Sequence, residues 1–298
     1  MTINRWVLFA GLTICATIVC ITIYSNWLVG RALQKVGLEI GAITNPISIH
    51  DSVWIEELTW LDVRDLVKSG TTSVILPTGG IEQNGPFVAT GKHNIVVELM
   101  SEKIARKLEN TLIAPVVKFV PEGQHEPPSG HMLFPGTIGL TESTFEAVLL
   151  EICLSLKNHG FTDIFIIGDS GGNQAAQNRV AQKLNRKWAA QGISVHHVES
   201  YYSFDKWGYM QLKELGVFQQ PDIQSAKRGK VHSDFYYESI LATADPELIR
   251  ASERRQIGQF IINDVSLDPI DKTVEIGQAL IEQRTELIAN EIKAILSQ

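Results

Sequence analysis

Two groups of polar side chains follow short apolar runs in the sequence. Glu82 comes soon after the run 73–77, His93 follows in the same loop, and Asp169 comes directly after the run 163–167. In an open parallel sheet, the side chains that do chemistry gather beyond the carboxyl ends of the strands. Two carboxylates and an imidazole suit Zn, Mn or Fe, and such a metal acidifies a bound water. A Glu in a turn and an Asp or His at a helix start are also common as solvated or capping groups, so both interpretations stay open.

The string from Gly168 to Gly172 allows a different chemistry. It fits the pattern G-x-S-x-G, and a strand followed by a turn and a helix is the setting of the nucleophile elbow in α/β-hydrolases. Ser170 would then be the nucleophile, with Asp222 or Asp234 and His232 as its later partners. Chymotrypsin-like proteases carry the same string, but they are all-β barrels and the surrounding pattern excludes them. Ser170 can also serve simply as a helix N-cap.

The scaffold for these groups is predicted by the alternation of short β-branched runs with longer amphipathic stretches from Ser52 onward. This alternation is typical of strand and helix units in a mostly parallel sheet, so we expect an α/β fold with α/β/α layers. The predicted strands are 73–77, 113–120, 163–167 and 193–198, and the predicted helices are 60–69, 94–108, 145–156, 174–190 and 272–298. The loop 121–136 is rich in Pro, Gly and His, and a loop of that length inside a domain is usually functional.

Composition excludes several classes of protein. The chain has 298 residues, of which 44% are hydrophobic and 20% charged, so wholesale disorder and a polytopic membrane protein do not fit. The net charge of −7 and the lack of a long basic run argue against a nucleic-acid partner. Cys15 and Cys20 lie in the apolar N-terminus, which leaves Cys153 as the one cysteine of the folded domain and rules out a disulfide framework there.

The N-terminus is predicted to meet lipid. Residues 6–24 form an apolar run without charge, which as a helix nearly crosses a hydrocarbon core. The residues that follow match a signal-peptidase site poorly. We therefore expect 1–30 to be a membrane anchor or signal segment, 31–44 a linker, and 45–298 one domain. We place that domain outside the cytoplasm, exported, membrane-anchored or periplasmic.

Four motifs, in order, resemble those of the creatininase (creatinine amidohydrolase) family. They are Glu82-Gln83-Asn84-Gly85-Pro86-Phe87 leading to His93, Phe134-Pro135-Gly136-Thr137 preceded by His131, Gly168 to Asn173, and His232-Ser233-Asp234. The match covers nearly the whole domain. It implies a creatininase-like layered fold, a homo-oligomer, and a metal-dependent hydrolase of an amide or cyclic amide C–N bond in a small molecule.

The sequence departs from the family at the metal-ligand positions. Family members bind a pair of divalent metals, and this chain has Asn84, His93 and Ser170 where they have His, Asp and His. The resemblance thus implies one or two Zn, Mn or Fe ions held by Glu82, His93 and Asp169. Because the ligand set differs, we do not expect creatinine itself as the substrate.

The remaining roles are also implied by the resemblance. His232 matches the histidine of the fourth motif and is the expected proton carrier, acting with Asp169, although a core histidine is an equal interpretation. Asp234 or Glu238 is expected to replace the missing fourth-motif carboxylate. The residues expected to bind substrate are Asn84, His131, Ser170 and Asn173. A binding protein that has lost catalysis is the alternative to both hydrolases.

Overall fold

The computed structural model describes residues 41–218 and 233–297, with a few isolated positions before residue 41. The chain divides into two compact units, 1–48 and 49–298. The predicted anchor or signal segment 1–30 lies outside the described residues apart from Leu28, and so does His232. In the part of the chain that is described, no helix is both long enough and apolar enough to cross a membrane.

The larger unit is built on a sheet of four parallel strands. In spatial order they are β2 (Thr111–Ile113), β1 (Ser73–Thr78), β3 (Asp163–Gly168) and β4 (Ser194–His197). β1 and β3 pair along their whole length, from Ser73 opposite Asp163 to Thr78 opposite Gly168. Both strands are continuous apolar runs, which is the pattern of strands buried on both faces. The predicted α/β fold with a parallel sheet is confirmed.

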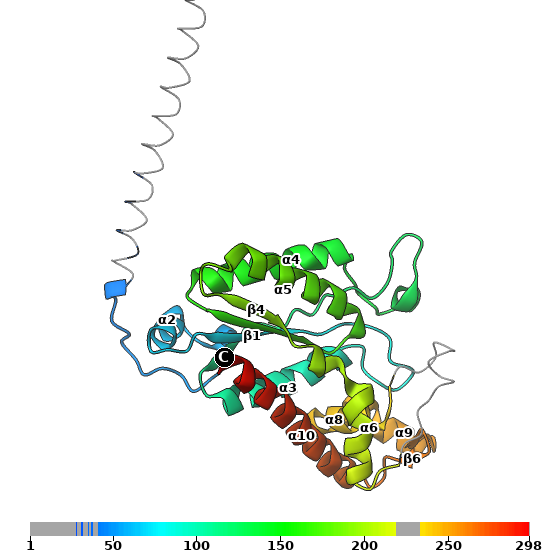
Figure 1. Ribbon diagram of the computed structural model, residues 1–298. Coiled ribbons are helices and arrows are strands. Elements are labelled where there is room, and N and C mark those ends of the chain that lie inside the picture. The colour runs from blue at the N-terminus through cyan, green and yellow to red at the C-terminus, as the bar shows by residue number, and fades with distance from the viewer. Residues whose placement is uncertain are drawn as a thin grey trace, which may run out of the picture. The chain divides into compact units, whose positions relative to one another are not determined.

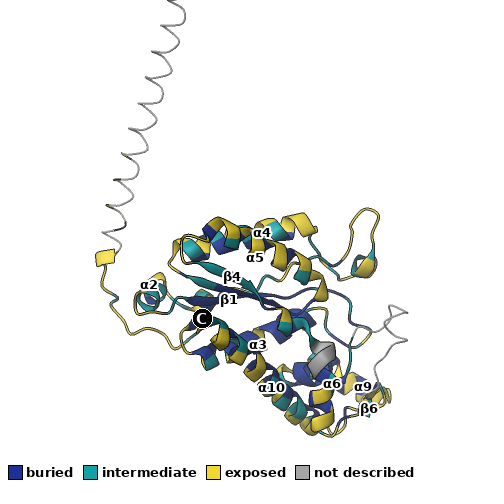
Figure 2. Ribbon diagram, in the orientation of Figure 1, coloured by how far each residue is buried: buried dark blue, intermediate teal, exposed yellow. Residues whose placement is uncertain are grey.

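Helices cover both faces of this sheet (Figure 1). On one face lie α2 (Trp60–Lys68), α4 (Glu142–Asn158) and α5 (Gln174–Trp188), and on the other lie α3 (Lys92–Leu108), α8 (Phe235–Ala244) and α10 (Ile270–Leu296). Successive strand residues point to opposite faces, so Val74 and Ile164 enter one core while Ile75 and Phe165 enter the other. β1 and β3 are accordingly buried between helices whose outer faces are exposed, whereas β4 at the sheet edge is only partly buried (Figure 2).

Shorter elements connect these layers. They are the helices α6 (Phe204–Glu214) and α9 (Ala251–Gln256), the antiparallel pair β5 (Ile261–Ile262) and β6 (Val265–Ser266), and the 3-10 turns η1 (Ile55–Glu57), η2 (Gly130–Leu133), η3 (Gly171–Asn173), η4 (Glu199–Tyr202) and η5 (Pro246–Ile249). The turn η2 lies inside the loop that the sequence predicts to be functional.

The predicted strand 113–120 is wrong in its extent. β2 ends at Ile113, shortly before Pro115, which has no N–H to donate to a strand ladder. Beyond the proline the chain still follows β1, but only through single bridges such as Thr78 with Val117. This irregular stretch leads directly into the loop that lines the candidate site.

Gly79 lies in the turn that leads from β1 toward the candidate site. A Cβ at this position would lie 2.9 Å from the Cα of Asn94 at the start of α3, and the Asn94 side chain accepts a hydrogen bond from the N–H of Gly80. The turn and the helix are therefore in close backbone contact, and only a glycine fits between them.

We expect Gly79→Ala to push α3 away from the sheet and to lower the free energy of unfolding by about 3 kcal/mol. Gly171→Ala is a matched control in the same region, because its Cβ would meet nothing within 4 Å. Its effect is expected to stay within about 0.5 kcal/mol. Urea unfolding of both variants measures the difference, and equal losses would contradict the close packing at Gly79.

Candidate active site

A cavity of about 1120 Å³ lies at the carboxyl-terminal edge of β1 and β3. Its walls come from the loop after β1, the loop after β2 and the turn after β3. Among the side chains that line it are Glu82, Glu122, His131 and Ser170. The long loop from residue 121 therefore forms one wall of this cavity, as the sequence predicts for a functional loop.

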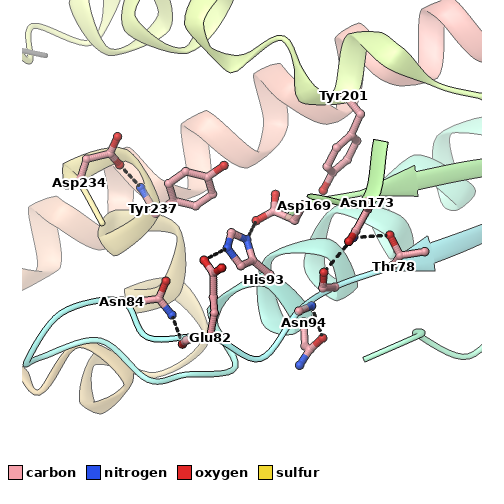
Figure 3. Close-up of polar contacts among 12 residues, drawn as sticks. Thr78, Glu82, Asn84, His93, Asn94, Asp169, Asn173, Tyr201, Asp234 and Tyr237 are labelled. Carbon is pink, nitrogen blue, oxygen red and sulfur yellow. Dashed lines mark hydrogen bonds and ion pairs between the residues drawn. The ribbon is translucent and has the colours of Figure 1, made fainter. Parts of the chain in front are cut away.

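His93 lies between two carboxylates (Figure 3). Its Nδ1 is 2.7 Å from Oδ2 of Asp169, and its Nε2 is 2.7 Å from Oε1 of Glu82. All three residues are buried. Each contact needs a proton between nitrogen and oxygen, so either the imidazole carries two protons or one carboxyl carries one. The structure thus brings together the three predicted ligands, as a hydrogen-bonded chain.

The second oxygen of each carboxylate also faces a nitrogen. Oδ1 of Asp169 accepts a hydrogen bond from Arg284 at 3.2 Å, and the same guanidinium donates to the carbonyl of Tyr201 at 3.0 Å. Oε2 of Glu82 lies 3.3 Å from Nε2 of His131. Burial alone would raise the pKa of Asp169, but the hydrogen bond from His93 and the charge of Arg284 lower it below its ordinary value. Asp169 is therefore an ionised carboxylate inside the fold.

This arrangement does not fit the predicted metal site. A metal ligand turns a nitrogen lone pair or a carboxylate oxygen toward a shared ion, whereas Glu82 and Asp169 face opposite nitrogens of one ring. Within residues 41–218 and 233–297, no group of three or more His, Cys, Asp and Glu side chains is placed so that it could hold a metal ion. The residues meet, but they do not share a point at which a cation could sit.

Two further titratable residues, Glu122 and Lys92, lie beside this hydrogen-bonded chain, and neither was among the predicted site residues. Burial raises the pKa of Glu122 to about 10, and the charge of Glu82 and a hydrogen bond with it add to the shift. Lys92 is buried, with its Nζ 4.8 Å from the centre of the Tyr237 ring. Burial lowers the pKa of Lys92, while the charges of Glu82 and other nearby acids act in the opposite direction.

Signals for these residues exist in the sequence. Glu122 follows the run 113–120, so it too stands where a strand was predicted to end, and Lys92 is the neighbour of His93. Arg284 lies on the buried face of α10, at helical spacing from Leu280 and Ile288. A charged residue within the apolar stripe of a helix is rarely buried unless it has a partner of opposite charge. The arginine at this position therefore indicates a buried acid nearby.

The residues predicted to bind substrate divide into two pairs. Ser170 and His131 line the cavity. Asn173 is fully buried and does not line the cavity. The amide of Asn173 donates to Oγ1 of Thr78 at 2.8 Å and to the carbonyl of Gly79 at 3.0 Å. These contacts tie the end of β1 to the turn after β3.

Asn84 also has a structural role. Its amide donates to the carbonyls of Glu82 at 3.0 Å and Ala89 at 3.1 Å, which fixes the loop that presents Glu82. It lines a separate cavity of about 220 Å³ that also contains Glu238 and Arg254. Asn84 therefore holds the loop that carries Glu82, and it does not line the large cavity.

The two acids of the fourth motif have partners of their own. Asp234 accepts a hydrogen bond from the N–H of Tyr237 at 3.0 Å and so caps α8. Oε2 of Glu238 lies 2.5 Å from Nη1 of Arg254, and both side chains are buried. Neither acid lines the large cavity.

The described residues give the serine-hydrolase alternative little support. No hydrogen bond joins the hydroxyl of Ser170 to a histidine among them, and both nitrogens of His93 already face carboxylates. A nucleophilic serine needs a base within hydrogen-bond reach. The proposed partner His232 lies outside the described residues.

Comparison with known proteins agrees with this fold. Residues 56–290 match the family model described as creatinine amidohydrolase. A 3-dehydro-scyllo-inosose hydrolase of Thermotoga maritima is 27% identical over 40% of this chain and 36% of its own length. A creatinine amidohydrolase of Pseudomonas putida is 27% identical over 37% of this chain and 41% of its own length. The matched part of the chain thus spans about two fifths of these curated relatives.

Solved structures match over a longer range. A mutant creatininase of Zn-Zn type and a Mn creatininase are each 18% identical, and the match covers 82% of this chain and 98% of theirs with a TM-score of 0.62. This likeness concerns the fold. Since the family model covers most of the chain, and the fold matches as well, this protein belongs to the creatininase family.

Proposed function

We propose that this protein hydrolyses a C–N bond, in an amide or cyclic amide, of a small molecule. Membership of the creatininase family supports the reaction class, and both curated relatives are named as hydrolases. The observation that carries the proposal is the position of Glu82. Its carboxylate lines the cavity and is held between His93 and His131.

The chemistry assigned to these residues is acid–base catalysis. Glu82 takes a proton from a water molecule as the water oxygen bonds to the amide carbon. His131, which lines the same cavity, gives a proton to the nitrogen as the C–N bond breaks. Asp169 fixes the ring of His93, and His93 in turn fixes the carboxylate of Glu82.

A divalent metal is the cofactor that the relatives suggest, because solved creatininases include a Zn-Zn form and a Mn form. The predicted ligands of this chain do not present a fitting donor set, so none of these steps passes through a metal. Metal content of the purified chain tests whether Zn²⁺ or Mn²⁺ binds at Glu82, His93 and Asp169.

The setting of the reaction is also a proposal. The apolar run 6–24 supports an anchor or signal that places the domain outside the cytoplasm. The family resemblance supports association of copies of the chain. Protease accessibility in intact cells and the molecular mass of the purified chain in solution test these two points.

The activity is tested by turnover on a panel of small amides, lactams and cyclic imides, with creatinine included. His131→Gln is expected to lower kcat by a factor of about 10² to 10⁴, because the amide cannot deliver a proton. Ser170→Ala is the matched control from the same cavity and is expected to keep kcat within about tenfold. Labelling of Ser170 by a fluorophosphonate together with loss of activity in Ser170→Ala would instead support the serine hydrolase. Ligand binding without turnover would support the non-catalytic relative.

A further inference from the structure

At the centre of the site, each carboxylate oxygen of Asp169 and Glu82 faces a nitrogen group of the chain itself. Asp169 faces His93 with one oxygen and Arg284 with the other. Glu82 faces His93 with one oxygen and His131 with the other. A metal ion bound by these two acids would have to compete with these nitrogen groups for the carboxylate oxygens.

Fixed positive charge is built into the same place. Arg284 is 1% exposed, and a guanidinium remains protonated under all ordinary conditions. It is anchored on three sides, by Asp169, by the carbonyl of Tyr201 and by the Tyr201 ring 4.0 Å away. Buried acids are stable when they are paired with charges of opposite sign, and here Arg284 supplies that charge to Asp169.

We infer that Arg284 takes the place of a metal cation at this site, so that the chain takes up no divalent ion between Glu82, His93 and Asp169. This goes beyond the proposed hydrolysis, because it holds whether or not the chain turns over a substrate. It also accounts for one altered ligand position, because the imidazole of His93 lies between Glu82 and Asp169.

The test is metal uptake by the purified full chain. The chain is equilibrated with Zn²⁺ or Mn²⁺, dialysed, and analysed for metal content and for Tm with and without the ion. We expect no stoichiometric metal and no shift of Tm in the unmodified chain. A site filled at a hundredfold excess over its Kd would raise Tm by about 5 to 10 °C.

Variants locate any uptake and test the role of the guanidinium. Arg284→Gln leaves Asp169 without its fixed cation, so Zn²⁺ or Mn²⁺ is expected to raise the Tm of this variant. Arg284→Lys keeps the charge, and its Tm is expected to stay unchanged by either ion. A metal response that is the same in both variants would overturn the charge role of Arg284.

The decisive result is stoichiometric metal in the unmodified chain that Glu82→Gln removes, which overturns the inference. Uptake that Glu82→Gln does not change lies elsewhere on the chain and leaves the inference standing. Turnover is assayed separately on the same samples. Bound metal with turnover overturns this inference alone, and a metal-free chain without turnover overturns only the proposed function.

Discussion

Glu82→Gln is expected to lower kcat by about 10³-fold, the loss that follows when a positioned general base is removed. The glutamine is nearly the same size as the glutamate, and its amide oxygen can still accept a hydrogen bond from Nε2 of His93. What disappears is the basic carboxylate at the cavity wall. The free energy of unfolding is therefore expected to change by less than about 2 kcal/mol. Steady-state kinetics and urea unfolding of the full chain measure the two quantities.

The neighbouring acid provides the matched control. The carboxyl of Glu122 lines the same cavity, but its pKa of about 10 keeps it protonated at neutral pH. Glutamine imitates a protonated carboxyl, so Glu122→Gln is expected to keep kcat within about tenfold. If both variants lost activity equally, the assignment of Glu82 as the base would fail, because the loss would reflect the cavity as a whole.

The second large effect concerns stability. Arg254 donates from Nη1 to Glu238 at 2.5 Å and from Nε to the carbonyl of Gln259 at 2.9 Å, and its guanidinium lies 4.7 Å from the centre of the Phe87 ring. Arg254→Met removes both hydrogen bonds and the counter-charge of Glu238, whose buried carboxyl must then either stay ionised without a partner or bind a proton. We expect a loss of about 3 to 5 kcal/mol in the free energy of unfolding. The double variant with Glu238→Gln is expected to recover a large part of it, because the uncompensated charge is gone.

The pH dependence gives an independent check on this pair. Burial raises the pKa of Glu238 from 4.5 to about 7, and the charge of Arg254 works against that rise. The folded chain therefore binds this proton more tightly than the unfolded chain, so the Glu238 contribution to stability falls as the pH rises from about 4.5 to 7, by about 3 kcal/mol in all. Without Arg254 the pKa of Glu238 rises further. The free energy of unfolding of Arg254→Met is therefore expected to be closer to that of the unmodified chain at pH 5 than at pH 8. A gap that does not change with pH would show that the loss comes from packing against Phe87.

The sequence predicts the layers of this fold because its strands are buried on both faces. The runs 73–77 and 163–167 are almost purely apolar, and each is observed as a strand one residue longer. The helix α4 was also visible, as an apolar stripe from Phe145 to Leu156. The strand predicted over 113–120 was wrong in extent because its β-branched residues surround Pro115. The missing N–H of the proline outweighs their preference for strands.

The candidate site is predictable to the extent that its residues stand at strand ends. Glu82, His93 and Asp169 do, and the structure brings them together. The way in which they meet could not be predicted, because it depends on a residue that the sequence places far away. Arg284 comes from the last helix and holds one oxygen of Asp169. No local pattern around Asp169 indicates that its partner lies so much later in the chain.

The origin of Arg284 in α10 has a consequence for synthesis of the protein. Asp169 and His93 leave the ribosome long before α10 does, so the acids are made well ahead of the guanidinium that pairs with them. The domain can therefore pair Asp169 with Arg284 only after translation has passed residue 284.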